Sequence, residues 1–186
     1  MIVWRVLPLD PAAASLEPGG PLWFPRALPG VGRHDNPDRY GCLYATLHPV
    51  AAVAEALAPF RGSGQLTDAM LMRGGRRLVL CSLELGAADG DGALVDLDDS
   101  RLLAVERLRP SQVATRTREV TQALALRLHD KHSDALGLRW WSTLEASWIN
   151  VTLFDRAAAR LALDRFEPLA PSDANTLAAA SFLGLG

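Results

Sequence analysis

The sequence predicts an α+β fold: a single compact domain, residues 1–186, with mixed or antiparallel sheets and flanking helices. Strand-like and helix-like stretches follow one another without regular alternation, which argues against a doubly wound parallel sheet. Hydrophobic residues make up 49% of the chain, enough for a sizeable core. Clusters of proline and glycine separate the stretches, and no internal repeat is present.

The first half of the chain predicts two strands, a helix and a third strand. Residues 1–10 form the first strand, and a proline- and glycine-rich connection covers residues 8–29. The short apolar run 42–47 is bounded by turn-forming residues and predicts a strand. A helix then begins at Pro49, where a missing N–H costs nothing, and ends at Pro59. The turn 73–76 leads into a strand over residues 77–85.

The second half predicts further strands and two long helices. The best helix covers residues 115–132, with Val113, Val120, Leu124 and Leu128 on its core face. Strands are expected at residues 93–97, 136–141 and 148–154, and residues 102–108 fit either a strand or a helix. Residues 155–163 are expected to be helical. The last helix lies within residues 172–185, with Ser172 or Asp173 as its N-cap.

Composition excludes several classes of function. The net charge of −2 does not suggest a nucleic-acid groove, and no run is long or apolar enough to span a membrane. The N-terminus lacks the layout of a signal peptide and fits a first strand. Cys42 and Cys81 lie inside apolar runs, which predicts buried thiols and a cytoplasmic protein.

No metal site is predicted. His129 and His132 lie three residues apart on the predicted long helix, but a third ligand is not visible, so a charge cluster at the helix end is the better interpretation. The acidic run 89–99 lacks the glycine and the closing glutamate of a calcium-binding loop. A solvated loop is expected there.

The stretch 29–57 carries the most chemistry. A glycine-rich loop presents Arg33, the following strand presents Tyr44, and the helix presents Glu55 away from its apolar face. A guanidinium, an aromatic ring and a carboxylate could hold a phosphate, stack a flat ring and stabilise a positive charge. Taken alone, each of these residues fits a structural or solvated role better than a functional one, and only the order of the three favours a site. Tyr40 is an alternative to Tyr44, and Arg39 competes weakly with Arg33.

The order of these residues resembles the RES domain, which is named for its arginine, glutamate and serine. The matching segments are G-V-G-R with Arg33, L-Y-A-T with Tyr44, A-A-V-A-E with Glu55 and R-W-W-S-T with Ser142. The resemblance spans about the whole chain. The sequence departs from the family pattern at residues 34–38, where an aromatic residue and an asparagine are expected, and at Thr143, where a basic residue is common.

The resemblance implies a fold similar to ADP-ribosyltransferases and a toxin of a type II toxin–antitoxin pair. RES toxins consume NAD⁺ and are neutralised by a helix-turn-helix antitoxin of the Xre type. NAD⁺ would be the substrate, with no further cofactor. The alternatives are transfer of ADP-ribose to a macromolecule, and a non-enzymatic module that binds a nucleotide or a partner protein.

The resemblance also assigns a role to each residue. Glu55 would hold the ribose and stabilise the oxocarbenium-like transition state as the nicotinamide–ribose bond breaks. Arg33 would bind the pyrophosphate. Tyr44, or Tyr40, would stack on the nicotinamide or ribose, and Ser142 would donate a hydrogen bond to the amide or a phosphate.

The apolar tail, residues 177–185, could dock on the antitoxin or within a homodimer. Packing onto the core of its own chain is the favoured interpretation.

Overall fold

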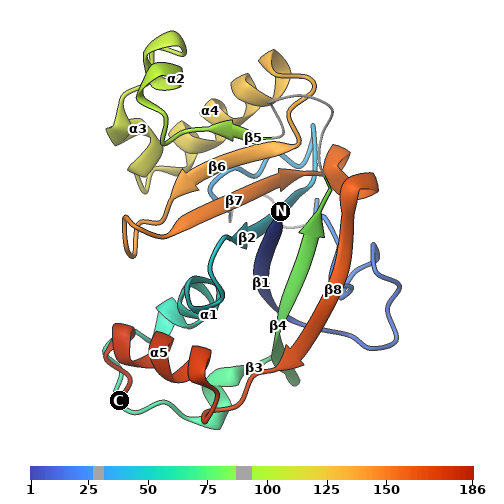
Figure 1. Ribbon diagram of the computed structural model, residues 1–186, viewed down its shortest axis with the longest axis vertical. Helices are drawn as coiled ribbons and strands as arrows, with labels where there is room; N and C mark the ends of the chain where they lie inside the picture. The colour runs from blue at the N-terminus through green and yellow to red at the C-terminus, as the bar shows by residue number, and fades with distance from the viewer. Residues whose placement is uncertain (27–31, 87–93) are drawn as a thin grey trace. The chain divides into compact units, whose positions relative to one another are not determined.

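The computed structural model describes residues 1–26, 32–86 and 94–186. Part of the glycine-rich loop and part of the acidic run, residues 27–31 and 87–93, therefore lie outside the described residues. The strands are β1 (Ile2–Pro8), β2 (Cys42–Thr46), β3 (Met72–Arg73), β4 (Arg76–Leu85), β5 (Leu94–Asp96), β6 (Gly137–Trp141), β7 (Ile149–Phe154) and β8 (Leu161–Pro168). The helices are α1 (Pro49–Leu57), α2 (Ser100–Val105), α3 (Pro110–Ala114), α4 (Arg118–Lys131) and α5 (Ala174–Leu183), and three short 3₁₀ segments are Ala58–Phe60, Asp68–Leu71 and Asp155–Arg160 (Figure 1).

The chain divides into two compact units. The first contains residues 1–23, 45–85 and 162–186, and the second contains residues 24–44 and 86–161. Strand β2 crosses the boundary, because residues 42–44 belong to the second unit and residues 45–46 to the first. The expectation of a single domain over residues 1–186 stays a prediction.

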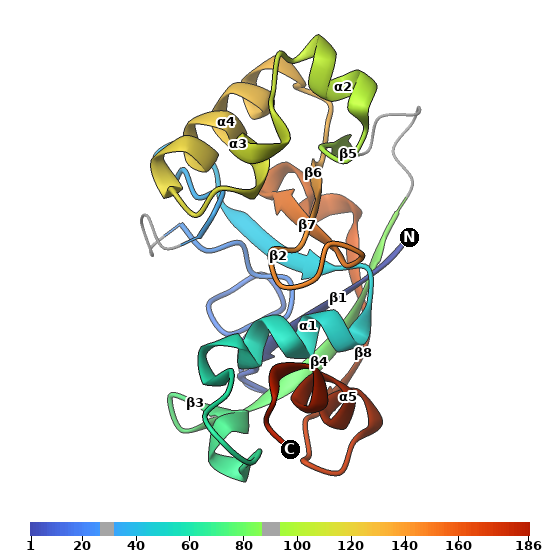
Figure 2. The same ribbon diagram turned by 90° about the vertical axis from the view of Figure 1, so that its left-hand side faces the viewer.

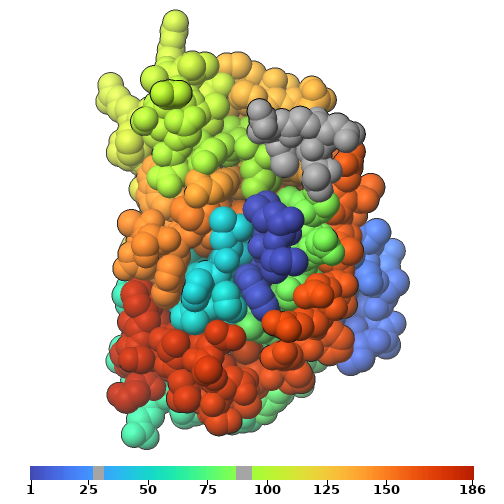
Figure 3. All heavy atoms as spheres, in the orientation of Figure 1, coloured from blue at the N-terminus to red at the C-terminus, as the bar shows by residue number. Residues whose placement is uncertain are grey.

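The first unit is built on strand β4. Strand β1 pairs antiparallel with it from Ile2 opposite Glu84 to Pro8 opposite Leu78. Strands β3 and β8 also pair with β4, and Figure 3 shows the dark blue β1 beside the green β4. The turn into β4 places Gly74 and Gly75 at positive φ, which residues with a side chain rarely adopt. The predicted turn 73–76 and the strand after it are thereby confirmed.

Helix α1 carries Glu55 and packs in the first unit. It begins where the sequence predicts, with Pro49 in its first turn and the His48 ring accepting a hydrogen bond from the Val50 N–H. The buried side chains of Ala54 and Leu57 lie on its core face. The helix packs against β1 and α5, as Figure 1 shows.

The apolar tail packs onto its own unit. Helix α5 ends at Gly184, whose φ of 68° forms a left-handed cap. The side chains of Leu183 and Leu185 are buried, and their carbonyl oxygens accept hydrogen bonds from the N–H groups of Gly62 and Leu66. The expectation that the tail covers its own core is therefore confirmed for these residues.

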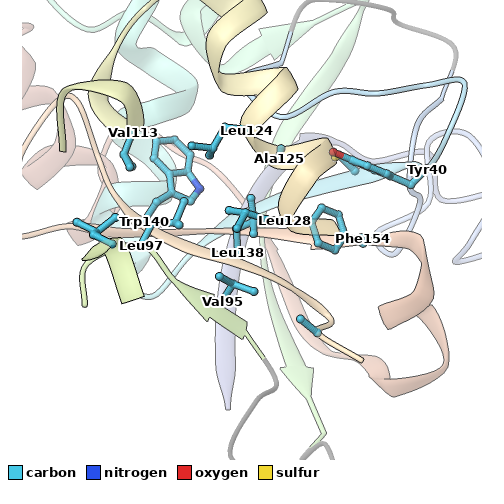
Figure 4. Packing of buried hydrophobic residues seen from close by; sticks show 13 residues of the cluster. Tyr40, Val95, Leu97, Val113, Leu124, Ala125, Leu128, Leu138, Trp140 and Phe154 are labelled. Atoms are coloured by element: carbon cyan, nitrogen blue, oxygen red, sulfur yellow. The ribbon is translucent and has the colours of Figure 1, made fainter. Parts of the chain in front are cut away.

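The second unit contains a mixed group of strands covered by helices. Strand β6 pairs antiparallel with β7 and parallel with β5. Helices α2, α3 and α4 lie together against β5 and β6 (Figure 2). Figure 4 shows the apolar cluster beneath them, with the Trp140 ring beside Val113 and Leu124. The predicted combination of mixed strands and flanking helices is confirmed.

The predicted helix over residues 115–132 is divided differently in the structure. Helix α3 ends at Ala114 and α4 begins at Arg118, so Val113 and Val120 do not share a helix. Leu124 and Leu128 lie on the core face of α4, as predicted, together with Ala125. The assignment of Val120 to the core was wrong, because its side chain is 38% exposed.

The helix predicted over residues 155–163 was also wrong. Residues Asp155–Arg160 form a 3₁₀ turn and β8 begins at Leu161. The alanines of this segment favour a helix locally, but the backbone after them pairs with β4. Long-range contacts hold the pairing, such as the hydrogen bond of 2.9 Å from Ser82 Oγ to Asp164 Oδ2.

Glu106 anchors the C-terminal end of α4. Its carboxylate is buried, and Oε1 lies 2.8 Å from Lys131 Nζ and 2.9 Å from His132 Nε2. Burial acts to raise the pKa of Glu106, but the hydrogen bonds and positive charges of Lys131 and His132 outweigh it and hold the pKa below its ordinary value. These contacts fix the helix whose opposite end reaches the candidate site.

We expect Glu106→Gln to lower the free energy of unfolding by about 1–2 kcal/mol. The substitution keeps the side-chain volume but removes the negative charge that the Lys131 ammonium and the His132 ring contact. Urea unfolding measures the change, with Glu17→Gln, an exposed loop glutamate, as the matched control. Equal effects of the two substitutions would contradict the anchoring role.

Candidate functional site

Arg33 is a buried arginine held by backbone groups. Its Nη1 donates hydrogen bonds to the carbonyl oxygens of Val113, at 3.0 Å, and Thr115, at 2.5 Å. Its guanidinium lies 4.9 Å from the centre of the Trp140 ring, within the range of a cation–π contact. The connection between α3 and α4 and the tryptophan of β6 therefore fix the position of the charge.

The backbone on either side of Arg33 is tied to α4. The Thr121 hydroxyl donates to the Arg33 carbonyl oxygen at 2.5 Å, and Gln122 Nε2 donates to the Gly32 carbonyl oxygen at 3.0 Å. Both side chains come from the first turns of α4. The loop that carries the arginine is thus fixed by a helix that begins 85 residues later, at Arg118.

His34 is the buried centre of this network. Its N–H donates to the Tyr44 hydroxyl at 2.9 Å, and its ring Nδ1 lies 2.8 Å from the Thr152 hydroxyl. Its carbonyl oxygen accepts hydrogen bonds from the Tyr40 hydroxyl and the Cys42 thiol. Burial, followed by the charges of Arg33 and Arg118, lowers the pKa of His34 to about 3, so the imidazole is neutral at neutral pH.

Asp35 holds the hydroxyl of Tyr44. That hydroxyl donates to Asp35 Oδ1 at 2.7 Å while accepting from the His34 N–H, and Asp35 Oδ2 accepts from the Gly32 N–H at 2.6 Å. Burial, helped by Cys42 and Asp35, raises the pKa of Tyr44 above its ordinary value. Tyr44 is therefore a neutral phenol in a fixed orientation.

Gly32 is required by the close approach of these groups. A Cβ atom at this position would lie 2.3 Å from Asp35 Oδ1 and 2.4 Å from the Tyr44 hydroxyl, so one of them would have to move. Since these two atoms are hydrogen-bonded to each other, moving either one breaks the bond that orients Tyr44.

We expect Gly32→Ala to lower the free energy of unfolding by about 1–3 kcal/mol, the usual cost of an added methyl group in a filled space. The Tyr44 hydroxyl should also lose its bond to Asp35. Thermal unfolding and the tyrosine spectrum measure the two effects. Gly86→Ala is the matched control, because the nearest atom to its added Cβ is the Arg160 carbonyl oxygen at 3.4 Å. A Gly32 variant as stable as the Gly86 variant would argue against this packing.

Tyr40 lies in the core of the second unit. It is 1% exposed, its ring stacks on His129 at 4.3 Å, and its edge meets Phe154. Burial is the main cause that raises its pKa. Figure 4 shows the ring at the end of the apolar cluster, beside Phe154.

Ser142 lies directly after β6 and is also buried. Its hydroxyl accepts a hydrogen bond from the Leu144 N–H at 3.0 Å, and its own N–H donates to the Trp148 carbonyl oxygen at 2.7 Å. These bonds shape the connection from β6 to β7.

The candidate residues are divided between the two units. Arg33, Tyr40, Tyr44 and Ser142 belong to the second unit, where the His34–Asp35 segment joins Arg33 to both tyrosines. Glu55 belongs to the first unit, half-buried on α1 next to the buried Ala54. Arg39 is exposed and forms an ion pair with Asp130 at 3.1 Å.

Several residues of the network were not identified from the sequence. The signal for His34 and Asp35 was present, since residues 34–38 depart from the family pattern. The structure shows that the departure supplies the buried imidazole and the carboxylate that orients Tyr44. The sequence gives no such signal for Thr121 and Thr152. These residues are far from the loop in the chain, and only folding brings their hydroxyl groups to Arg33 and His34.

The described residues contain neither a metal-binding cluster nor a membrane-spanning helix. No three or more histidine, cysteine, aspartate or glutamate side chains in residues 1–26, 32–86 and 94–186 are placed to hold a metal ion. No helix in the same ranges is long and apolar enough to cross a membrane. Cys42 and Cys81 are buried free thiols, as predicted.

Comparison with known proteins identifies the family. A chain of the crystal structure of the M. tuberculosis MbcT–MbcA toxin–antitoxin complex superposes with a TM-score of 0.64 at 15% identity, covering 92% of this chain and 85% of that one. No match was found among curated proteins. The sequence profile of the RES domain matches residues 2–173, which include Arg33, Tyr44, Glu55 and Ser142. The chain therefore belongs to the RES domain family.

Proposed function

We propose that this protein is the toxin of a type II toxin–antitoxin pair and depletes NAD⁺ in the cytoplasm by cleaving the nicotinamide–ribose bond. The observation that carries the proposal is the RES domain match, which spans nearly the whole chain and includes Arg33, Tyr44, Glu55 and Ser142. The similarity to a chain of a toxin–antitoxin complex supports it. NAD⁺ is the substrate, and no other cofactor takes part.

The chemistry needs little from the protein beyond binding and charge stabilisation. Nicotinamide leaves as a neutral molecule, so the carboxylate of Glu55 serves mainly to stabilise the positive charge on the ribose as the bond breaks. Water or inorganic phosphate then attacks the ribosyl carbon and releases ADP-ribose or phosphorylated ADP-ribose.

Three further candidate residues have proposed roles in binding the substrate. The guanidinium of Arg33 is the proposed pyrophosphate ligand, and its backbone anchors at Val113 and Thr115 keep it in place before substrate arrives. Tyr44 is the proposed wall for the nicotinamide or ribose. We prefer it to Tyr40, whose ring is covered by His129 and Phe154. Ser142 would donate to the amide or a phosphate.

The partner in this proposal is an Xre-type helix-turn-helix antitoxin. Expression of the protein alone should stop growth and lower cellular NAD⁺, and expression together with the antitoxin should restore both. Growth arrest with an unchanged NAD⁺ concentration would show that the protein is a toxin that acts through another reaction.

The direct test is the NAD⁺ concentration over time with the purified protein. Wild-type protein should consume NAD⁺, and Arg33→Lys, which keeps the charge but loses the planar fork of donors, should be much slower. Arg39→Lys is the matched control, because Arg39 is an exposed arginine in the same loop. Unchanged NAD⁺ with folded, partner-free wild-type protein would overturn the proposal.

Product analysis separates the alternative reactions. Free ADP-ribose indicates hydrolysis, and phosphorylated ADP-ribose indicates phosphorolysis. Label from NAD⁺ found on protein or nucleic acid would instead indicate ADP-ribosyl transfer. Binding of NAD⁺ without any product would indicate the non-enzymatic module.

A further inference from the structure

Arg118 is a second arginine beside the Arg33 loop, and part of its guanidinium is buried without a partner among the described residues. Its Nη1 is buried and has no hydrogen-bond partner within residues 1–26, 32–86 and 94–186. Over the same ranges its guanidinium takes part in no ion pair and no cation–π contact. A buried polar atom without a partner is costly, and a charged one more so, which calls for an explanation.

The position of Arg118 is fixed by the same contacts that fix Arg33. Arg118 is the first residue of α4, and the Thr121 hydroxyl lies 3.2 Å from the Arg118 carbonyl oxygen and 2.5 Å from the Arg33 carbonyl oxygen. The side chains of Arg33 and Arg118 both lie close enough to the buried His34 imidazole to oppose its protonation. Thr121 therefore ties the backbone of Arg118 to that of Arg33, and the charges of both residues act on His34.

The buried Nη1 of Arg118 is unfavourable as long as no group accepts a hydrogen bond from it. The neighbouring His34 imidazole is neutral, so it supplies no negative charge to Arg118. The nearby carboxylate of Asp35 already accepts from the Tyr44 hydroxyl and the Gly32 N–H. An anion with several oxygens would accept a hydrogen bond from Arg118 Nη1 and match its positive charge, and guanidinium groups match phosphate oxygens in geometry.

We propose that Arg118, together with Arg33, binds a phosphate or pyrophosphate group of the ligand. The amide groups at the start of α4 favour the same charge, because Thr117 provides no side-chain cap for them. This inference rests on the proposed function for the identity of the ligand, the pyrophosphate of NAD⁺. The anion site itself rests on Arg118 and its surroundings.

The test compares Arg118→Gln with Arg116→Gln. Arg116 is an exposed arginine two residues earlier, so its substitution makes the same change in net charge. Calorimetric titration with ADP-ribose and with inorganic pyrophosphate measures binding without turnover, and adenosine is the probe that lacks phosphate. Arg118→Gln should weaken the two phosphate-bearing ligands by about 10- to 100-fold and leave adenosine unchanged, while Arg116→Gln should change none of them by more than about twofold.

A stability measurement separates this role from a structural one. Removing a buried charge that has no partner should leave the midpoint of thermal unfolding unchanged or raise it. In kinetic measurements on Arg118→Gln, KM for NAD⁺ should rise by about the same factor as the dissociation constant for ADP-ribose, while kcat should change much less. The reason is that the lost contact binds the ground state and the transition state equally. A variant that unfolds more readily and binds normally would overturn the proposal.

The two proposals fail in different ways. If wild-type protein consumes NAD⁺ and neither its KM nor ADP-ribose binding depends on Arg118, the anion site is wrong and the proposed function stands. If no NAD⁺ is consumed but pyrophosphate binding depends on Arg118, the site stands and the proposed function is wrong. If the Arg116 and Arg118 variants lost ligand affinity equally, the change in net charge alone would explain the loss, and the proposed anion site would be wrong.

Discussion

Replacing Glu55 with glutamine is expected to lower the rate of NAD⁺ consumption by about 10²–10³-fold. A positioned charge that stabilises a developing opposite charge contributes about 3–4 kcal/mol to the transition state. The glutamine keeps the size and the hydrogen-bonding reach of the side chain, so the loss isolates the negative charge. Because Glu55 lies on the half-exposed side of α1, the helix should keep its stability.

The measurement is the initial rate at saturating NAD⁺, which reports on kcat. Glu84→Gln is the matched control, since Glu84 is an exposed glutamate of β4 in the same unit, and its rate should stay within about twofold of wild type. Thermal unfolding of both variants tests whether the fold is kept. A Glu55→Gln protein with full activity would remove the carboxylate from the mechanism.

An aspartate at this position gives a finer test. Glu55→Asp keeps the charge and moves it back by one methylene group. If distance to the ribose matters, its rate should fall between those of the wild type and the glutamine variant. A rate equal to that of Glu55→Gln would mean that position matters as much as charge.

The local elements of the fold could be predicted because their signals are local. Pro49 marks the first turn of α1, the paired glycines 74 and 75 mark the turn into β4, and apolar runs mark β6 and β7. Strand β8 has no such signal. Most of its side chains are exposed, and pairing with β4, which lies far earlier in the chain, determines its conformation.

The candidate site likewise has a part that the sequence predicts and a part that only the fold determines. Arg33, Tyr44, Glu55 and Ser142 could be proposed because their order along the chain resembles a family. What the sequence could not supply is the support of Arg33, which comes from the carbonyl oxygens of α3 and its following residue and from Trp140. Arg118 was missed for a related reason. It looked like one more charge on an amphipathic helix, and only packing shows that its Nη1 is buried.

The buried His34 should make the protein sensitive to acid. Its pKa is about 3 in the folded protein and about 6.5 in the unfolded chain, so the unfolded state binds more protons between these values. The free energy of unfolding should therefore fall as the pH drops from about 6.5 towards 3, and should not change through this group above about 7. The full effect is on the order of several kcal/mol.

A variant without the imidazole isolates this contribution. His34→Asn cannot titrate, and its free energy of unfolding should depend less on pH between about 6.5 and 4 than that of the wild type, even if it is less stable at neutral pH. Urea unfolding at a series of pH values measures both slopes, and His48→Asn, at the N-cap of α1, is the control.

A second measurement covers the case in which His34→Asn does not fold. In wild-type protein, the NMR signals of the His34 ring should show no protonation between about pH 8 and the onset of acid unfolding. Protonation near pH ~6 in the folded state would contradict a neutral buried imidazole. It would also weaken the case for two guanidinium groups beside it, because the lowered pKa reflects burial first and then the charges of Arg33 and Arg118. The His34 titration is therefore a check on the electrostatics of the anion site that does not depend on any ligand.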